Sequence, residues 1–128
     1  MKPERKLWQD LKKNTPEIRW TRIENLAIPG VPDLLGYNEN HTFFTVELKV
    51  ARGNKVKLSP HQIAFHTLHP VNSFILVKSL APRDEKLATY FLYEGACCSL
   101  LAARGLSLDA LHSGSLGACC LLLKLRGA

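Results

Sequence analysis

The clearest hydrophobic pattern in the chain is the alternation of apolar and polar positions over residues 42–50, which predicts a β-strand. Its apolar face carries the side chains of Phe44, Val46, Leu48 and Val50. Glu47 and Lys49 fall on the opposite face, because successive side chains of a strand point to opposite sides. The strand therefore presents a carboxylate and an amine together, away from its apolar stripe.

Helical and strand periods cover most of the remaining chain. Apolar residues at helical spacing predict helices over residues 3–13, 60–69 and 96–104, and the first two also have a proline in the first helical turn. Further strands are predicted over residues 18–26, 34–37, 73–80 and 89–93. Gly105 is the expected C-cap of the third helix, and residues 119–125 fit either a strand or a helix. This order predicts one α/β domain over residues 1–128, with a central mixed β-sheet flanked by helices.

The composition fits one soluble domain, with 128 residues of which 46% are hydrophobic and 22% charged. The first ten residues lack the apolar core of a secretory signal. The longest uncharged run, residues 110–123, is shorter than the roughly 20 apolar residues that span a bilayer. We therefore expect a cytoplasmic protein without a membrane partner; a phage-encoded one would act in the host cytoplasm.

The four cysteines occur as two adjacent pairs, Cys97-Cys98 and Cys119-Cys120. Neither pair has the CxxC spacing that is typical of zinc or redox sites. We expect these cysteines to be reduced and buried, where they act as small hydrophobic side chains.

Basic residues exceed acidic ones by 17 to 11, and the net charge of +6 favours a polyanionic partner such as nucleic acid. Residues 2–57 contain 11 of the 17 basic residues together with 7 of the 11 acidic ones. A predicted loop over residues 51–58 contains Arg52, Lys55 and Lys57 and no acidic residue, a pattern typical of contacts to DNA phosphates. A solvated surface loop is the alternative explanation.

Two carboxylates are expected to meet beside the alternating strand. Asp33 follows the turn-forming run Pro-Gly-Val-Pro and begins the strand over residues 34–37, and residues 38–41 form the hairpin loop. Neighbouring strands lie about 4.8 Å apart. Asp33 can therefore approach Glu47 closely enough for both carboxylates to bind one divalent cation.

Such a carboxylate pair needs a cation, because two adjacent negative charges repel each other and are costly to bury. Mg²⁺ prefers oxygen ligands, and the backbone carbonyl of Leu48 is a further candidate. Lys49 would orient the attacking water or stabilise a negatively charged transition state. The alternative is that Asp33 caps a turn while Glu47 pairs with Lys49 on a solvated face of the strand.

Pro32-Asp33 and Glu47-Leu48-Lys49 together resemble the two halves of the motif of the PD-(D/E)xK nucleases. The likeness extends to the runs Arg22-Ile23-Glu24-Asn25, Pro29-Gly30-Val31-Pro32 and Leu58-Ser59-Pro60-His61-Gln62. Over roughly residues 1–80 the chain looks like the small phage and bacterial VRR-type nuclease domains of that superfamily. The resemblance implies a restriction-endonuclease-like core and a DNA endonuclease that depends on Mg²⁺, with Mn²⁺ as a substitute. Stand-alone domains of this type resemble Holliday-junction resolvases, which work as homodimers.

The resemblance also implies roles outside the central motif. The family usually adds an acidic metal ligand from the first helix, which Glu4 matches by position, with Glu24 as a competitor. Gln62 occupies the family's glutamine position, where it would help to hold the metal-site water or the substrate phosphate. The residues expected to contact DNA are Arg22, Arg52, Lys55 and Lys57. The alternatives are a Glu4 favoured only by the helix dipole and a Gln62 that is simply exposed.

These observations predict a Mg²⁺-dependent endonuclease that hydrolyses phosphodiester bonds in branched DNA, either a four-way junction or a flap, as a homodimer. Within the same fold the alternatives are a nickase or a restriction-like enzyme. Outside it they are a non-catalytic DNA-binding module or an interaction domain that uses the C-terminal third. That third, residues 105–128, departs from the family's pattern. Trp8 and Trp20 fit apolar positions and are expected in the core rather than stacked on bases.

Overall fold

The computed structural model of the chain describes residues 2–23, 29–80 and 88–128. The α-helices are α1 (Pro3–Asn14), α2 (Pro60–Leu68), α3 (Cys98–Arg104) and α4 (Leu116–Leu125). The strands are β1 (Arg19–Arg22), β2 (Leu34–Tyr37), β3 (Phe43–Ala51), β4 (Ser73–Ser79), β5 (Thr89–Glu94) and β6 (His112–Gly114). Two short 3₁₀ turns, η2 (Gly95–Cys97) and η3 (Gly105–Ser107), flank α3.

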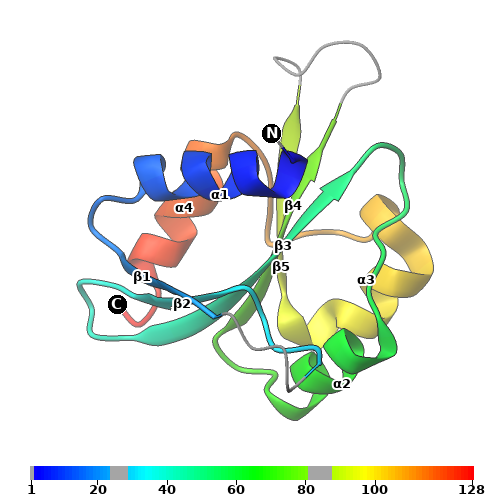
Figure 1. The fold of residues 1–128 in the computed structure, drawn as a ribbon, viewed down its shortest axis with the longest axis horizontal. Helices are drawn as coiled ribbons and strands as arrows, with labels where there is room; N and C mark the ends of the chain where they lie inside the picture. Colours follow the sequence, from blue (N-terminus) through cyan, green and yellow to red (C-terminus); the bar gives the residue numbers. More distant parts are fainter. Residues whose placement is uncertain (1, 24–28, 81–87) are drawn as a thin grey trace.

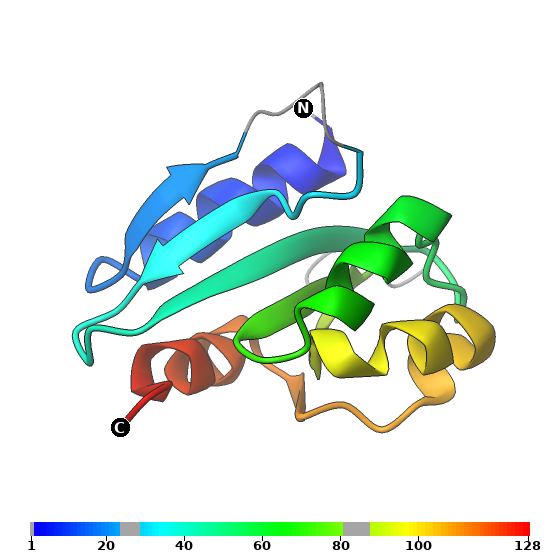
Figure 2. The ribbon, with the colours of Figure 1, turned by 90° about the horizontal axis from the view of Figure 1, so that it is seen from below.

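The six strands form one mixed sheet in the order in which they occur along the chain. β3 and β4 are parallel, and every other neighbouring pair is antiparallel. Parallel neighbours need a crossover connection, and α2 supplies it between β3 and β4. Helices α1 and α4 lie on one side of the sheet, whereas α2 and α3 lie side by side on the other (Figures 1 and 2). The predicted α/β class, a central mixed sheet flanked by helices, is confirmed.

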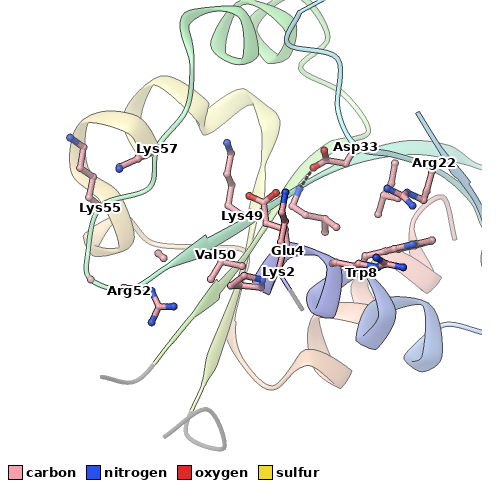
Figure 3. A pocket seen from close by; sticks show the side chains of 16 residues that line it. Lys2, Glu4, Trp8, Arg22, Asp33, Lys49, Val50, Arg52, Lys55 and Lys57 are labelled. Atoms are coloured by element: carbon pink, nitrogen blue, oxygen red, sulfur yellow. Dashed lines mark hydrogen bonds between the residues drawn. The ribbon is translucent and has the colours of Figure 1, made fainter. Parts of the chain in front are cut away.

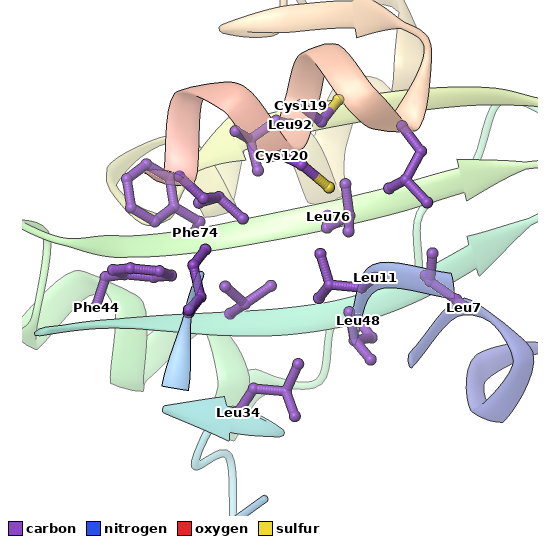
Figure 4. Close-up of a cluster of buried hydrophobic side chains, with 14 residues drawn as sticks. Leu7, Leu11, Leu34, Phe44, Leu48, Phe74, Leu76, Leu92, Cys119 and Cys120 are labelled. Atoms are coloured by element: carbon purple, nitrogen blue, oxygen red, sulfur yellow. The ribbon is translucent and has the colours of Figure 1, made fainter. Parts of the chain in front are cut away.

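Hydrophobic side chains fill both sides of the sheet. Under α1 and α4, Leu7, Leu11 and Leu48 pack with Cys119 and Cys120 in a single buried cluster (Figure 4). A second cluster lies under α3 and is formed by Ala51, Val56, Ile75, Val77, Tyr93, Cys98 and Leu101. Because β3 and β4 are covered on both sides, full burial of each leucine or isoleucine there contributes about 1.5–3 kcal/mol. The site described below is built on this rigid centre.

The predicted helices and strands occur within a few residues of their expected ends, and the segment left open over residues 119–125 is helical. Ser115 begins α4, because its side chain accepts a hydrogen bond from the backbone N–H of Ala118. The sequence did not predict β6, whose three residues are too few to show an alternation and which pairs with β5. Residues 24–26 of the predicted first strand, the competitor Glu24 among them, and the predicted turn 82–86 lie outside the described residues.

All four thiols are free, and Cys98, Cys119 and Cys120 are buried as predicted, whereas Cys97 is only half-buried. Burial raises the pKa of the Cys119 thiol to about 12 and that of Cys120 to about 11. These two thiols therefore behave as core side chains. None of the helices in the described parts of the chain has the length and apolarity to cross a bilayer.

Candidate active site

The register of the first hairpin positions Asp33. Leu34 pairs with Val46, so the residue before β2 stands opposite Glu47 on β3. The backbone carbonyl of Asp33 accepts a hydrogen bond from Ile23 N at 2.8 Å, and its Oδ2 atom accepts one from Leu48 N at 2.8 Å. The Asp33 side chain thus bonds to β3 at the place where the ladder with β2 stops.

The same contact orients the backbone carbonyl of Leu48. In a strand, the N–H and C=O groups of one residue point to the same side. Since the N–H of Leu48 donates to Asp33, its C=O faces the side on which Asp33 lies. Two carboxylates and one backbone carbonyl are therefore gathered at this edge of β3.

The turn before Asp33 is held against the start of α2. Gly30 has φ +86°, and a Cβ atom added there would collide with the backbone carbonyl of His61. Only glycine satisfies both the positive φ and this close approach without strain. The loop that carries Asp33 and the helix that carries Gln62 are thereby fixed to each other.

Gln62 connects the helix cap to the functional side chains of β3. Ser59 caps α2 by accepting from Gln62 N at 3.1 Å, while Gln62 Oε1 accepts from Ser59 N at 3.0 Å. The same oxygen accepts from Lys49 Nζ at 3.0 Å, and Gln62 Nε2 donates to Glu47 Oε1 at 2.5 Å. The amide therefore bridges the carboxylate and the amine of the predicted motif, and it is not simply an exposed helix residue.

Glu47 is almost fully buried, with 1% of its surface exposed. Burial, the hydrogen bond to Asp33 and the Asp33 charge raise the pKa of Glu47 to about 9, although Lys49 opposes this shift. Two adjacent carboxyl groups that cannot both ionise hold a proton between them. A divalent cation can replace that proton, so the electrostatics fit a cation-binding pair.

Glu4 joins this pair from the first turn of α1. Its side chain is exposed at the wall of a cleft, where partial desolvation and the Asp33 charge raise its pKa and Lys49 opposes the shift. No three acidic, histidine or cysteine side chains among the residues that the structure describes are already arranged around one metal position. The residues that fit an oxygen-liganded cation are thus the Asp33–Glu47 pair and Leu48, with Glu4 close by.

The cleft has a volume of about 1000 Å³ and opens between α1, β3 and the loop that follows β3. Seven of the site side chains predicted from the sequence line it: Arg22, Arg52, Lys55, Lys57, Glu4, Asp33 and Lys49. Figure 3 shows Glu4 and Asp33 near its middle, with Arg52, Lys55 and Lys57 on one side and Trp8 and Arg22 on the other. All four predicted DNA-contacting residues therefore share one cavity with the acidic residues.

Lys2 and Arg5, which the sequence did not single out, line the same cleft. Trp8, predicted in the core, packs against the core but is only half-buried and also lines the cleft. Lys2 precedes α1, and Arg5 and Trp8 lie on it. Their closeness to Glu4 in the sequence was the available signal, but a helical pattern does not show where a helix packs. With Lys2 and Arg5, the described part of the chain contributes seven basic and two acidic residues to the lining of the cleft. The electrostatic potential in the cleft therefore favours binding of a polyanion more strongly than the net charge of the chain indicates.

A second buried contact fixes α2 on the sheet. His66, one helical turn after Gln62, is fully buried, and its Nδ1 lies 2.6 Å from Ser73 Oγ. Ser73 Oγ in turn accepts from Thr45 Oγ1 at 3.1 Å. Burial lowers the pKa of His66 to about 4, with His69 and Lys49 adding to the shift. His66 is therefore neutral near pH 7 and helps to place Gln62 over Glu47.

Comparisons with known proteins find similarity among solved structures. No family model and no curated protein matches the sequence. Among solved structures, the chain is similar to Hjc of Archaeoglobus fulgidus, a Holliday junction resolvase from an archaeal hyperthermophile. The two share 19% sequence identity with a TM-score of 0.49, over 72% of this chain and 74% of that one.

Proposed function

We propose that this chain is a metal-dependent endodeoxyribonuclease that hydrolyses phosphodiester bonds in branched DNA. The observation that carries the proposal is the contact between Asp33 and Glu47, next to Lys49, beside a cleft with a large excess of basic residues. Paired carboxylates hold a divalent cation, and the surrounding positive charge attracts a polyphosphate. A DNA phosphate can meet both features in one place.

Asp33, Glu47 and the Leu48 carbonyl would hold Mg²⁺, or Mn²⁺ in its place, with Glu4 as an additional ligand. This set contains only oxygen atoms, which is what Mg²⁺ prefers. When bound, the cation supplies a water of lowered pKa and screens the charge of the phosphate. Near pH 7 Glu47 holds a proton that it would give up to serve as a ligand, so the affinity for the cation should rise with pH.

Lys49 and Gln62 would act on the phosphate side of the site. The Lys49 ammonium group is held by Gln62 Oε1, with its side chain half-buried at the cleft wall. From there it would orient the attacking water or neutralise the additional negative charge of the pentavalent transition state. Gln62 keeps Glu47 and Lys49 at a fixed separation, which makes it a positioning residue.

Branched DNA is the proposed substrate, and a homodimer is the proposed assembly. The basic residues that line the cleft suit contacts to DNA phosphates, and such contacts position DNA without reading its sequence. A two-fold dimer would present two sites to a junction of approximate two-fold symmetry. Paired incisions would follow from that symmetry.

The proposal is tested by incubating the purified chain with a labelled four-way junction, a flap and a linear duplex, in Mg²⁺ and in EDTA. Metal-dependent cleavage is expected on the junction or flap, and light scattering with and without junction reports the dimer. Asp33→Asn can still accept from Leu48 N, and Glu47→Gln resembles the protonated carboxyl, so both variants should fold and bind DNA without cutting it. Asp10→Asn, which removes a carboxylate on α1 outside the cleft, is the matched control and should cut normally. Absence of cleavage on all three substrates, or full activity in Asp33→Asn, would contradict the proposal.

A further inference from the structure

Trp8 is the only aromatic side chain among the described residues that line the cleft. It is half-buried, and its ring packs edge-on against Trp20, with the centroids 6.0 Å apart and the planes at 86°. The ammonium group of Lys12 lies 5.2 Å from the centre of the Trp8 ring. These two contacts hold the indole in one orientation while part of its surface faces the cleft.

The two tryptophans differ in what their indole nitrogens do. Trp20 Nε1 donates to Thr15 Oγ1 at 2.8 Å, and its ring also packs edge-on against Phe44. Trp8 Nε1 has no hydrogen-bond partner within the described parts of the chain, and it is not among the fully buried polar atoms. Trp20 is therefore committed to the core, whereas Trp8 keeps a donor and part of an aromatic surface for another molecule.

The position of Trp8 on α1 sets its distance from the proposed reacting centre. Glu4 and Trp8 are four residues apart, so they lie on the same face of the helix, about 6 Å apart along its axis. Glu4 is next to Asp33 and Lys49. One nucleotide of a stacked strand advances about 3.4 Å. A nucleotide one or two positions from the scissile phosphate would therefore reach Trp8.

We propose that Trp8 stacks on an unpaired DNA base next to the cutting site, so that the enzyme selects DNA that is single-stranded at this point. The faces of bases inside a continuous duplex are covered by their neighbours, and only a splayed or unpaired base offers a face to an indole. A cleft of about 1000 Å³ is the size of a small-ligand pocket and accommodates a short single strand. An aromatic platform within a basic groove is the arrangement that binds single strands without sequence preference. The inference rests on the proposed nuclease function and narrows its substrate class.

The test uses the full chain labelled with 5-fluorotryptophan, which gives two ¹⁹F resonances because the sequence contains two tryptophans. Trp8→Phe and Trp20→Phe each remove one resonance and so assign them. In EDTA, a single strand and a flap are expected to shift the Trp8 resonance in a saturable way and to leave that of Trp20 in place. A closed duplex without ends should shift the Trp8 resonance several-fold less. No shift with the single strand, or an equal shift with the closed duplex, would overturn the inference.

Substitutions give an independent measure. Trp8→Leu should weaken single-strand binding about tenfold and closed-duplex binding less than twofold, and Trp8→Phe should restore most of the loss. Unchanged single-strand affinity in Trp8→Leu would overturn the inference. If Trp8→Leu does not fold, the ¹⁹F shifts of the labelled native chain still show whether Trp8 contacts the single strand. Cleavage without a shift of the Trp8 resonance would leave the nuclease proposal intact and reject the stacking role. A shift of the Trp8 resonance without cleavage would keep the contact between Trp8 and the base and reject the nuclease proposal.

Discussion

At Glu47, folding favours the protonated carboxyl, whereas the proposed cation binding needs the ionised carboxylate. Its pKa is raised from 4.5 to about 9, because the carboxyl is buried beside Asp33. The folded chain therefore keeps a proton that the unfolded chain releases. The contribution of this proton to stability is complete below about pH 4.5 and is lost as the pH rises toward 9. Without divalent cations, we expect the stability of the native chain to fall relative to that of Glu47→Gln over this interval, as measured by urea unfolding at a series of pH values.

Adding Mg²⁺ to the native chain and to Glu47→Gln tests whether a cation replaces this proton. A cation that replaces the proton stabilises the folded chain by mass action, and it competes less with protons at higher pH. Mg²⁺ should therefore raise the Tm of the native chain more at pH 8 than at pH 6, with little effect on Glu47→Gln. An equal rise in both proteins would place the cation elsewhere.

Gln62 tests whether the bridge between Glu47 and Lys49 matters for the reaction. Gln62→Ala removes the hydrogen bonds to both side chains, and loss of a group that orients a metal ligand typically costs 10–100-fold in affinity or activity. We expect a loss of cleavage in that range, part of which is recovered at high Mg²⁺. Ser59→Ala removes the side-chain cap of the same helix and is the control, with lower stability and nearly normal cleavage at 25 °C. Equal losses in both variants would assign the effect to helix stability alone.

The central residues of the site could be predicted because they depend on local geometry. Strand periodicity places Glu47 and Lys49 on one face, and a short hairpin brings Asp33 opposite Glu47, as the register confirms. The burial of Glu47 and the presence of Trp8 in the cleft depend on where α1 and α2 pack on the sheet. No local pattern reports such packing, because it is decided by contacts between elements distant in the sequence.

At the scale of elements, the Pro-Gly turn and α2 act as one unit. Gly30→Ala would force an alanine into φ +86° and against the His61 carbonyl, and strain of this kind costs on the order of 1–3 kcal/mol. We expect a loss of about 2 kcal/mol in urea unfolding and, because Asp33 follows the turn, weaker cleavage. Gly53→Ala, where no atom lies within 4 Å of the added methyl and no positive φ is present, should change stability by less than about 0.5 kcal/mol. Similar losses in both variants would show that the turn is not fixed on α2.

The elements differ in how well their sequences specify them. β3 combines a long alternation with a central position in the sheet, and its predicted and observed ranges differ by one residue at each end. α4 carries apolar residues on most of its surface, including the exposed Leu121 and Leu125, so no helical period separates it from a buried strand. Ser115, the N-cap residue, was the available sequence signal that a helix begins there.

At the scale of the whole molecule, the charges are concentrated rather than spread. The N-terminal turn of α1 and the loop after β3 are far apart in sequence, and the fold places both around one cleft. Among the residues with a described structure, seven cations surround two acidic lining residues there. A phosphate backbone would therefore meet a strong local positive field, even though the chain carries a net charge of only +6. Because the positive charge is concentrated in the cleft, the effect of cleft substitutions on the salt dependence of DNA binding reports whether DNA lies there.

Each ion pair between the protein and a DNA phosphate releases counterions, so the slope of log affinity against log salt becomes shallower by roughly 0.7–0.9 for each such pair that a substitution removes. We expect the double variant Lys55→Ala/Lys57→Ala to flatten this slope by about 1–2 and to weaken binding of all sequences alike. The matched control is Lys13→Ala/Arg104→Ala, which removes two exposed cations outside the cleft and the same net charge. Fluorescence anisotropy of a labelled flap in EDTA, from low to physiological salt, gives both slopes. If DNA binds in the cleft, only the Lys55→Ala/Lys57→Ala variant should have a flatter slope. Equal flattening in the two double variants would mean that DNA binding depends on the net charge of the chain rather than on the cleft.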